Sequence, residues 1–308
     1  MIQRADFSLA DLVPFISWTY FFHAWGFAPR FAAVARQHDC PGCRATWLAS
    51  FDETERPKAA EAARLYDDAL ALLRQQAPGR CARGCFGLFP AWADGDDLLL
   101  LDDCGHTHRL PCLRQQRVVR EGDPYLCLAD FVRPLGGPEP DRVGLFVTTA
   151  GETGEQPPTP DDYRHLLAQT LADRLAEAAA ERLHRDVRRI HWGYAPDERL
   201  TPDELLAERY QGIRPAVGYP SLPDQSLAFL LDALLDFGRI GVRLTESGAM
   251  QPHASVCGLM LAHPAARHFA VGPIDRAQFE DYARRRGLPP KVMQKYLAAN
   301  YTPQTSRP

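Results

Sequence analysis

Three kinds of pattern are missing from this chain, and each absence argues against a class of protein. No apolar run approaches the roughly 18 residues of a membrane span, and the amino terminus has no signal-peptide pattern. The net charge of −4 gives no electrostatic reason to expect nucleic acid or an anionic membrane surface as a partner. Gly-x-Gly-x-x-Gly, P-loop and Gly-x-Ser-x-Gly motifs are also absent, which disfavours dinucleotide-binding, P-loop and serine-hydrolase sites.

What is present is the composition of an ordinary globular protein. Of the 308 residues, 45% are apolar and 24% are charged, so the chain can bury a substantial core in one large domain or two smaller ones. With no membrane span and no signal peptide, we expect a cytoplasmic protein. The eight cysteines are then expected to be free thiols, because disulfides rarely persist in a reducing compartment.

Two cysteine pairs raise the question of a metal. Cys40-Pro-Gly-Cys43 and Cys81-Ala-Arg-Gly-Cys85 could together offer four thiolates to zinc. The second spacing is loose, however, and about forty residues separate the pairs, so we predict no metal site. A thioredoxin-like redox role for the first pair is disfavoured as well, since no βαβ pattern surrounds it.

A second group of potential ligands follows an apolar run. His106 and His108 lie beside Cys104 and Cys112 in the sequence, a combination that resembles metal ligands. The stretch from Asp102 to His106, Asp-Asp-Cys-Gly-His, is more typical of a hairpin turn. We therefore predict a turn there.

Helical and strand patterns occur in clusters. Helices are expected at 56–76, from about 160 to 190, from 202, at 227–235 and at 275–286, and strands at 87–89, 98–101, 143–149, 242–245, 256–262 and 268–271. The long second helix should begin after a linker at 151–160, with Thr159 as its N-cap and Pro160 in its first turn, and Thr201 should cap the third. The apolar stripe of the second helix comprises Leu167, Leu171, Leu175, Leu183 and Val187. Clustering of this kind predicts an α+β fold rather than a doubly wound sheet.

The stretch from Tyr210 to Asp224 is the most unusual part of the sequence. Pro215 and Pro220 fix φ and remove two hydrogen-bond donors, while Gly212 and Gly218 permit turns that other residues avoid. We predict a rigid, extended loop that presents Arg214, Tyr219 and free backbone amides to a ligand. A proline-braced crossing of the surface is the alternative.

This stretch also carries a resemblance. Arg214-Pro-Ala-x-Gly-Tyr-Pro, followed by Leu244-Thr-Glu-Ser-x-Ala-Met-x-Pro-x-Ala-Ser-Val, resembles the S-adenosylmethionine-binding activation domain of cobalamin-dependent methionine synthase. The same family is matched, in order, by Trp18-Thr-Tyr-Phe-Phe, Gly87-Leu-Phe-Pro, Leu113-Arg-Gln-Gln, Cys127-Leu-Ala-Asp-Phe, Leu171-Ala-Asp-Arg-Leu-Ala-Glu, Trp192-Gly-Tyr-Ala-Pro and Asp281-Tyr-Ala-Arg. The resemblance implies one activation domain spanning residues 1–308, with its core at about 12–300 and helices packed around a mainly antiparallel sheet.

The resemblance also implies a binding site for S-adenosylmethionine. Arg214 would hold the ligand carboxylate, because its planar guanidinium is permanently charged. Pro215, Ala216 and Gly218 would bring the backbone close to the ligand, and Tyr219 would offer a ring face and a hydroxyl near the methyl group. Glu177 resembles an acidic residue that faces the ligand in the family, although on pattern alone it could be a solvated helix glutamate. His268 and Phe269 correspond to an aromatic pair that contacts the ligand.

Two positions depart from the family pattern. Ser17 stands where the family has an acidic residue that receives the ligand's α-ammonium, and His268 stands where it has a tyrosine. A neutral hydroxyl forms no ion pair with an ammonium, so these departures predict weaker binding or a modified site.

The remaining modules of methionine synthase are not recognisable in the sequence. It contains neither Asp-x-His-x-x-Gly, which holds the corrinoid, nor the paired-cysteine zinc motif of the homocysteine-binding module. We therefore expect a reactivation subunit that binds S-adenosylmethionine and acts on cobalamin carried by the cobalamin-binding subunit, with a flavodoxin-like reductant. This makes it a methyltransferase component that is not competent alone. A non-catalytic docking module, or an activator of another corrinoid methyltransferase, are the alternatives.

Overall fold

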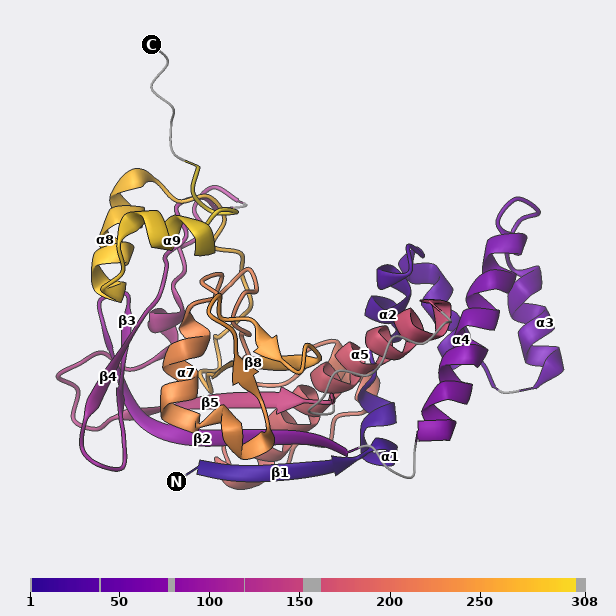
Figure 1. Ribbon diagram of the computed structural model, residues 1–308, viewed down its shortest axis with the longest axis horizontal. Helices are drawn as coiled ribbons and strands as arrows, with labels where there is room; N and C mark the ends of the chain where they lie inside the picture. The colour runs from indigo at the N-terminus through magenta and orange to yellow at the C-terminus, as the bar shows by residue number, and fades with distance from the viewer. Residues whose placement is uncertain (1, 39, 77–80, 119, 152–161, 303–308) are drawn as a thin grey trace, which may run out of the picture.

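The computed structural model describes residues 2–38, 40–76, 81–118, 120–151 and 162–302 (Figure 1). The predicted linker therefore lies almost entirely outside the described residues, as do the expected cap at Thr159 and first turn at Pro160. None of the described helices is long and apolar enough to cross a membrane.

The long strand β2 (Cys81–Asp94) organises the main sheet. Strand order is β4-β3-β2-β5-β8, and β1 (Ile2–Ser8) shares one edge of β2 with β3 (Asp97–Leu101). The other members are β4 (Thr107–Pro111), β5 (Asp141–Thr149) and β8 (Ser255–Met260). Every pairing among these strands is antiparallel, and Phe146 of β5 lies between Phe86 and Gly258 of its neighbours. The predicted α+β fold with a mainly antiparallel sheet is confirmed.

Helices cover both faces of this sheet. A β-carbon added at Gly84 would lie 3.3 Å from Leu183 of α5 (Asp162–Asp186), whereas one added at Gly87 would lie 3.3 Å from Leu235 of α7 (Leu227–Leu235). Since residues three apart on a strand point to opposite faces, α5 and α7 lie on opposite sides. The predicted apolar stripe of α5 is buried from Leu167 to Val187.

Further helices extend the α5 side. The core there continues into α2 (Trp18–Ala24) and α4 (Arg56–Gln76), and Figure 1 shows α4 and α3 (Pro41–Ala49) at the end of the molecule farthest from β3 and β4. At the opposite end, α8 (Arg276–Arg286) and α9 (Pro290–Tyr296) form a small core of their own around Phe279 and Met293. The helix predicted at 56–76 is confirmed to the residue, and the helix predicted at 275–286 is α8, with Asp275 as its N-cap.

Short elements connect these layers. They are α1 (Leu9–Leu12), η1 (Val13–Phe15), η2 (Pro29–Arg36), α3 (Pro41–Ala49), η3 (Leu128–Phe131), η4 (Val187–His191), α6 (Pro202–Leu206), η5 (Phe237–Ile240), β6 (Arg243–Leu244) and β7 (Met250–Gln251). Thr201 forms the predicted capping box with Glu204 at the start of α6. The strand predicted at 268–271 was wrong: this segment makes only an isolated backbone bond, from Val271 N–H to the Pro220 carbonyl at 2.9 Å, and is not part of a sheet.

Candidate functional site

The Arg214 segment, residues 211–220, runs beside β8. Ile213 exchanges two backbone hydrogen bonds with Leu261, and Val217 donates to the Cys257 carbonyl at 2.9 Å. Ala216 lies opposite Gly258, where a β-carbon would come within 2.8 Å of the Ala216 Cα. Glycine at 258 therefore lets the segment lie directly against the strand. The expected loop with free amides was partly wrong. The amides of Ile213 and Val217 are bonded to β8 and the residue that follows it, and those of Gly218 and Tyr219 are bonded within the turn.

Gly218 shapes a turn at the end of the segment. Its φ is +86°, its N–H donates to the Leu222 carbonyl at 2.8 Å, and a β-carbon there would lie 2.5 Å from Gln225 Oε1. This left-handed conformation explains why glycine is needed. The turn leaves the neighbouring Tyr219 side chain 47% exposed.

A row of polar side chains on α5 and its continuation faces the Arg214 segment. Glu177, Glu181, His184 and Arg188 recur at intervals of four, three and four residues, so they share one helical face. The row begins at the half-buried Glu177 and continues into the interior, where Glu181, His184 and Arg188 are buried. Helix α5 thus buries its predicted apolar stripe and presents a second, charged face to the segment.

Two contacts join this row to the segment. Arg214 Nη1 lies 3.1 Å from Glu181 Oε2, and the Tyr219 hydroxyl hydrogen-bonds to the Glu177 carboxylate. Burial is the largest single influence on the Arg214 guanidinium and would lower its pKa, but the charges of Glu181 and Glu177 and the hydrogen bond to Glu181 are among the contributions that together raise that pKa above its ordinary value. Burial, followed by the charge of Glu177, raises the pKa of the Tyr219 hydroxyl. Both groups therefore keep their protons at neutral pH.

These contacts correct the expectation that Arg214 is an exposed loop cation. Its side chain is only 14% exposed, and its partner Glu181 is 7% exposed. Removing Arg214 would leave a buried carboxylate without its cation, so the residue contributes to stability as well as to any ligand contact. Glu177, by contrast, accepts a hydrogen bond from Tyr219 and is not the freely solvated glutamate that its pattern also allowed. That it faces a ligand stays a prediction.

A second layer lies behind Arg214. Arg188 is fully buried, forms a two-pronged ion pair with Glu198 at 2.7 Å for each contact, and places its guanidinium 3.9 Å from the centre of the Tyr210 ring. His184 packs edge-on against the same ring at 5.2 Å. Burial, and then the charges of Arg188 and Arg214, lower the pKa of His184 well below its ordinary value, so this imidazole is neutral.

This layer is incompletely hydrogen-bonded. Among the described residues, Glu181 Oε1, Arg188 Nη1 and both ring nitrogens of His184 are buried without a hydrogen-bond partner. Buried polar atoms without partners are uncommon in proteins and are usually paired with water or a ligand. Glu181, His184 and Arg188, which share one helical face, can therefore each form a further hydrogen bond.

The other predicted site residues lie around this row in different ways. The buried backbone of Pro215 and Ala216 lies against β8, and His268 Nε2 lies 3.7 Å from a carboxylate oxygen of Glu208. The charges of Arg214 and Glu181 also act on His268, whose pKa is lowered chiefly by burial. Phe269 is half-buried and packs against the α7-side and α8–α9 cores, and its contact with a ligand stays a prediction.

Ser17 is the N-cap residue of α2 and is half-buried. Its side chain makes no capping hydrogen bond, although its carbonyl accepts one from the Phe21 N–H at 3.1 Å. The hydroxyl is therefore not needed to start the helix. Whether it faces a ligand stays a prediction.

Sequence reasoning missed Glu181, His184, Arg188, Glu198 and Gly258. The first three carried a usable signal, because they continue from Glu177 at helical spacing. Glu198 and Gly258 carried none, since their partners are set by the path of the chain. Glu198 reaches Arg188 only because a π-type turn at Val187–His191 ends the helix, a feature that is frequent at functional sites.

The four-thiolate zinc site is not formed. The Cys85 thiol is buried on the α7 side of β2, 3.8 Å from the Leu235 carbonyl, and is therefore not available to join Cys40 and Cys43. The predicted turn at residues 102–106 is confirmed: Asp102 accepts from the Cys104 and His106 amides at 2.9 and 2.8 Å. The side chain of Cys81 lies outside the described part of the structure.

The polar row and Arg214 are suited to bind a small molecule that carries both a negative and a positive charge. A guanidinium is suited to bind a carboxylate, and the carboxylates of Glu177 and Glu181 favour a cation close to it. A zwitterionic, amino-acid-like ligand carries both charges. The fold and this row therefore define an α+β domain with a candidate site for a small charged molecule.

Comparison with known proteins identifies the family. Residues 8–287 match the sequence model of the family described as vitamin B12 dependent methionine synthase, activation domain. The chain is also similar to a solved structure, the crystal structure of the MetH reactivation domain bound to AdoHcy. The two share 37% sequence identity with a TM-score of 0.82, and the match covers 99% of this chain and 91% of that one.

The chain therefore belongs to the activation-domain family of vitamin B12-dependent methionine synthase. This confirms the resemblance seen in the sequence motifs. The parent enzyme of the family is a methyltransferase, and membership implies partnership with a cobalamin-binding domain.

Proposed function

We propose that the polar row of α5 and the Arg214 segment bind S-adenosylmethionine for the reactivation of cobalamin on a partner protein. The observation that carries this proposal is a pair of neighbouring contacts. Arg214 lies 3.1 Å from Glu181, and beside it the Tyr219 hydroxyl hydrogen-bonds to Glu177. Support comes from the solved relative, which binds AdoHcy, the demethylated form of the same ligand. At 37% identity over 99% of this chain, an equivalent ligand is a reasonable expectation.

Arg214 is proposed to hold the ligand carboxylate. Its guanidinium is fixed against Glu181 through Nη1, which orients the group before the ligand arrives. A pre-oriented donor loses less conformational freedom on binding than a flexible one. Pro215 restrains the backbone next to it, and Ala216 and Gly218 keep bulky side chains away from the approach.

Glu177 and Tyr219 are proposed to face the positively charged part of the ligand. Glu177 supplies the negative charge nearest the exposed end of the row, and Tyr219 supplies a half-exposed ring joined to it. Ser17 and His268 complete the proposed site with neutral groups. Since Ser17 carries no charge, Glu177 takes a larger share in balancing the α-ammonium.

The reaction itself depends on groups that this chain does not supply. S-adenosylmethionine provides the methyl group, and a flavodoxin-like reductant is proposed to deliver the one electron that cob(II)alamin on the partner needs. The role of this chain is to bind the methyl donor and orient it toward the partner's cobalt, which is a matter of position and charge. We propose that residues 1–308 form one domain for this purpose, which acts as a methyltransferase component and not alone.

Calorimetric titration of the purified chain with S-adenosylmethionine and AdoHcy tests the proposal. Arg214→Ala should weaken both ligands by roughly 10- to 150-fold, which corresponds to a lost charge-assisted hydrogen bond of ~1.5–3 kcal/mol. Arg209→Ala is the control. Arg209 lies just before the same segment in the sequence, and its side chain is 69% exposed, so this variant should bind like the unmodified chain.

Folding must be separated from binding in this experiment. Arg214→Ala leaves the Glu181 carboxylate buried, so the double variant Arg214→Ala/Glu181→Gln removes that charge and should fold while still failing to bind. Full affinity in either variant would refute the assignment. If the unmodified chain binds no ligand but still alters the visible spectrum of a cobalamin-loaded partner, it is a docking module instead. Co-purification with a different corrinoid methyltransferase would change the assigned partner.

A further inference from the structure

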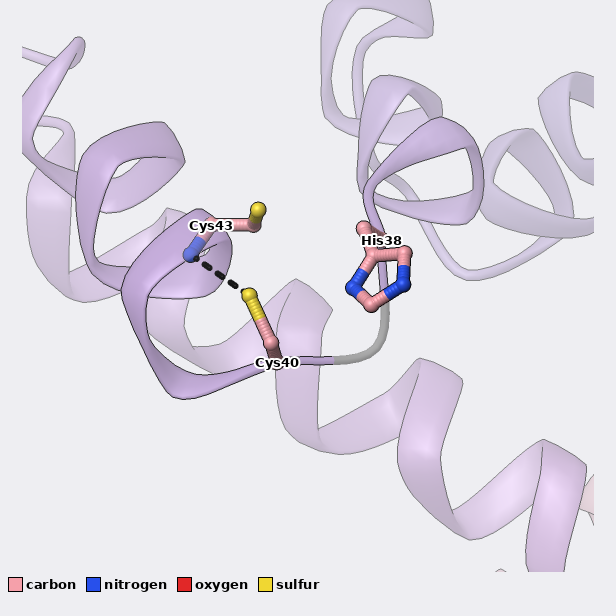
Figure 2. A group of neighbouring side chains, drawn as sticks. All are labelled: His38, Cys40 and Cys43. Carbon is pink, nitrogen blue, oxygen red and sulfur yellow. Dashed lines mark hydrogen bonds between the residues drawn. The ribbon is translucent and has the colours of Figure 1, made fainter.

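Three metal-ligand side chains meet at the start of α3, away from the polar row. Cys40 is the N-cap residue of this helix, Cys43 lies in its first turn, and His38 precedes Cys40 by two residues (Figure 2). One ligand atom from each, the two sulfurs and a ring nitrogen, all lie within 4.8 Å of one another. The sulfurs are half-buried and the imidazole is exposed, so a solvated ion can reach all three.

The backbone prepares the first sulfur for this role. Cys40 Sγ accepts a hydrogen bond from the Cys43 N–H at 3.2 Å, in the position where a serine oxygen would cap a helix. Pro41 at the first helical position helps fix this geometry. The Cys40 sulfur is therefore held in place at the start of α3 by the backbone itself.

We propose that His38, Cys40 and Cys43 bind a divalent cation of the zinc class. Two sulfurs and one imidazole nitrogen suit zinc, and three protein ligands leave a fourth tetrahedral position for water or another donor. Bonds of about 2.3 Å to both sulfurs in a tetrahedron need an S···S separation of about 3.8 Å. The observed spacing lies close enough for small rotations of the side chains to reach it.

A second group of potential ligands is explained by its turn. Asp102, Cys104 and His106 also lie within 4.8 Å of one another, but they offer only one thiol. Both Asp102 oxygens are already engaged: Oδ1 accepts from two backbone amides, and Oδ2 lies 2.7 Å from His108 Nε2. These bonds close the β3–β4 hairpin, and nothing further is needed to account for them.

An ion held by His38, Cys40 and Cys43 would join two helical elements. His38 follows η2, whereas both cysteines belong to the start of α3. Helix α3 is in turn tied to α4 by Arg44 and Asp67, whose nearest atoms are 2.8 Å apart. The metal would therefore fasten η2 to the α3–α4 pair at the end of the molecule. This role is independent of S-adenosylmethionine binding.

The test uses the reduced, metal-free full chain under anaerobic conditions, titrated with Co(II) and then with Zn(II). We expect one equivalent of Co(II) with a sulfur-to-cobalt charge-transfer band, its displacement by Zn(II), and a melting temperature that rises with Zn(II). Cys40→Ser and Cys43→Ser should abolish the band, and serine keeps the N-cap of α3 satisfied. His38→Ala should weaken binding at least about tenfold, since even outer partners of metal ligands contribute that much.

The matched control is the double variant Cys104→Ser/His106→Ala, which removes the other group and should bind Co(II) normally. Loss of the band in this control, or its persistence in Cys40→Ser, would overturn the assignment. A chain that binds no metal but readily forms a reversible Cys40–Cys43 disulfide when oxidised glutathione is added as the oxidant, seen as a mass loss of two hydrogen atoms, would also overturn it in favour of a redox pair.

Discussion

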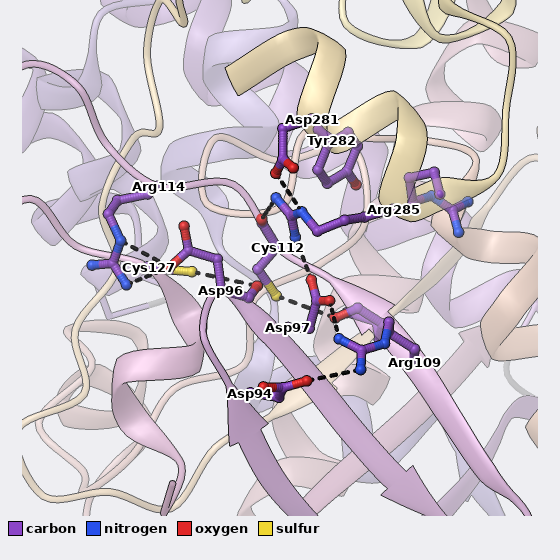
Figure 3. Close-up of polar contacts among 12 residues, drawn as sticks. Asp94, Asp96, Asp97, Arg109, Cys112, Arg114, Cys127, Asp281, Tyr282 and Arg285 are labelled. Atoms are coloured by element: carbon purple, nitrogen blue, oxygen red, sulfur yellow. Dashed lines mark hydrogen bonds and ion pairs between the residues drawn. The ribbon is translucent and has the colours of Figure 1, made fainter. Parts of the chain in front are cut away.

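The protein contains two buried charge networks that differ in how completely their atoms are paired. In the first, Asp97 at the start of β3 contacts Arg109 of β4 with one oxygen and Arg285 of α8 with the other (Figure 3). Arg285 also donates to Asp281 at 2.7 Å and to the Cys112 carbonyl at 3.2 Å. In the second, around Arg214, one oxygen of Glu181 and both nitrogens of His184 have no hydrogen-bond partner among the described residues.

The difference points to different roles. A buried charge is tolerated when its polar atoms find partners. Both Asp97 oxygens and all three guanidinium nitrogens of Arg285 have a partner, and the network joins α8 to the sheet. The Arg214 network contains buried donors and acceptors without partners among the described residues, and it lies next to the half-exposed Tyr219. Spare hydrogen-bonding capacity costs stability and is useful only where water or a ligand completes it.

The largest effect should come from the complete network. Asp97→Ala leaves the largely buried Arg285 without its main partner, and we expect a loss of about 3–5 kcal/mol in the free energy of unfolding. Asp94→Ala is the matched control, because Asp94 pairs with the same Arg109 at 2.8 Å but is 42% exposed. It should cost no more than about 1 kcal/mol. Urea unfolding of both variants measures the difference.

Equal losses in the two variants would show that Asp97 contributes no more than an exposed ion pair. Binding offers a second readout. A destabilised Asp97→Ala that is still folded should retain its affinity for AdoHcy, because α8 contributes no residue to the polar row. Loss of affinity in folded protein would mean that the two networks are coupled.

The comparison also shows what the sequence could and could not reveal. Local signals were sufficient for α4, for the apolar stripe of α5 and for the capping box at Thr201, because each depends on residues a few positions apart. The strand β1 was missed because only Phe7 of its residues is buried, so it lacks the alternation that marks a half-buried strand. The pairing of Arg214 with Glu181 joins residues 33 positions apart and depends on where β8 places the segment.

Family resemblance located part of the site that periodicity could not. It pointed to Arg214, Tyr219 and Glu177, two of which are in contact. It gave no sign that Arg214 is largely buried, because burial follows from packing against α5 and β8. It also pointed to Phe269, which is half-buried against the α7-side core and whose contact with a ligand stays a prediction.

His184 should make the protein sensitive to acid. Burial lowers its pKa in the folded state, so the unfolded chain, with a pKa near 6.5, binds the extra proton first. The stabilising contribution is therefore complete above about pH 6.5 and is lost as the pH falls below it. Arg188 and Arg214 add positive charge around this imidazole, His268 adds more once it is protonated, and Glu181 adds negative charge.

His184→Phe keeps the ring against Tyr210 but has no proton to gain. Between pH 7.5 and 5.5 the unmodified chain should lose about 1.4 kcal/mol more stability than this variant, provided that the folded imidazole stays neutral. Chemical unfolding at the two pH values measures the difference. Parallel losses would show that His184 takes up its proton in the folded protein and is not held neutral by its surroundings.

The smallest effect, a change in ligand affinity, should come from Glu181→Gln. This variant tests why the network around Arg214 is incompletely hydrogen-bonded. Glutamine keeps an acceptor for Arg214 Nη1 but removes the negative charge that a ligand carboxylate would meet beside that guanidinium. We expect S-adenosylmethionine and AdoHcy to bind more tightly by roughly three- to tenfold, about 1 kcal/mol. Methylthioadenosine lacks the carboxylate and serves as the matched ligand, whose affinity should not change. Stability should fall less than in Asp97→Ala, because Glu177 still lends Arg214 its charge. Weaker binding of AdoHcy by the folded variant would mean that Glu181 serves the ligand by orienting Arg214, and that its charge does not compete.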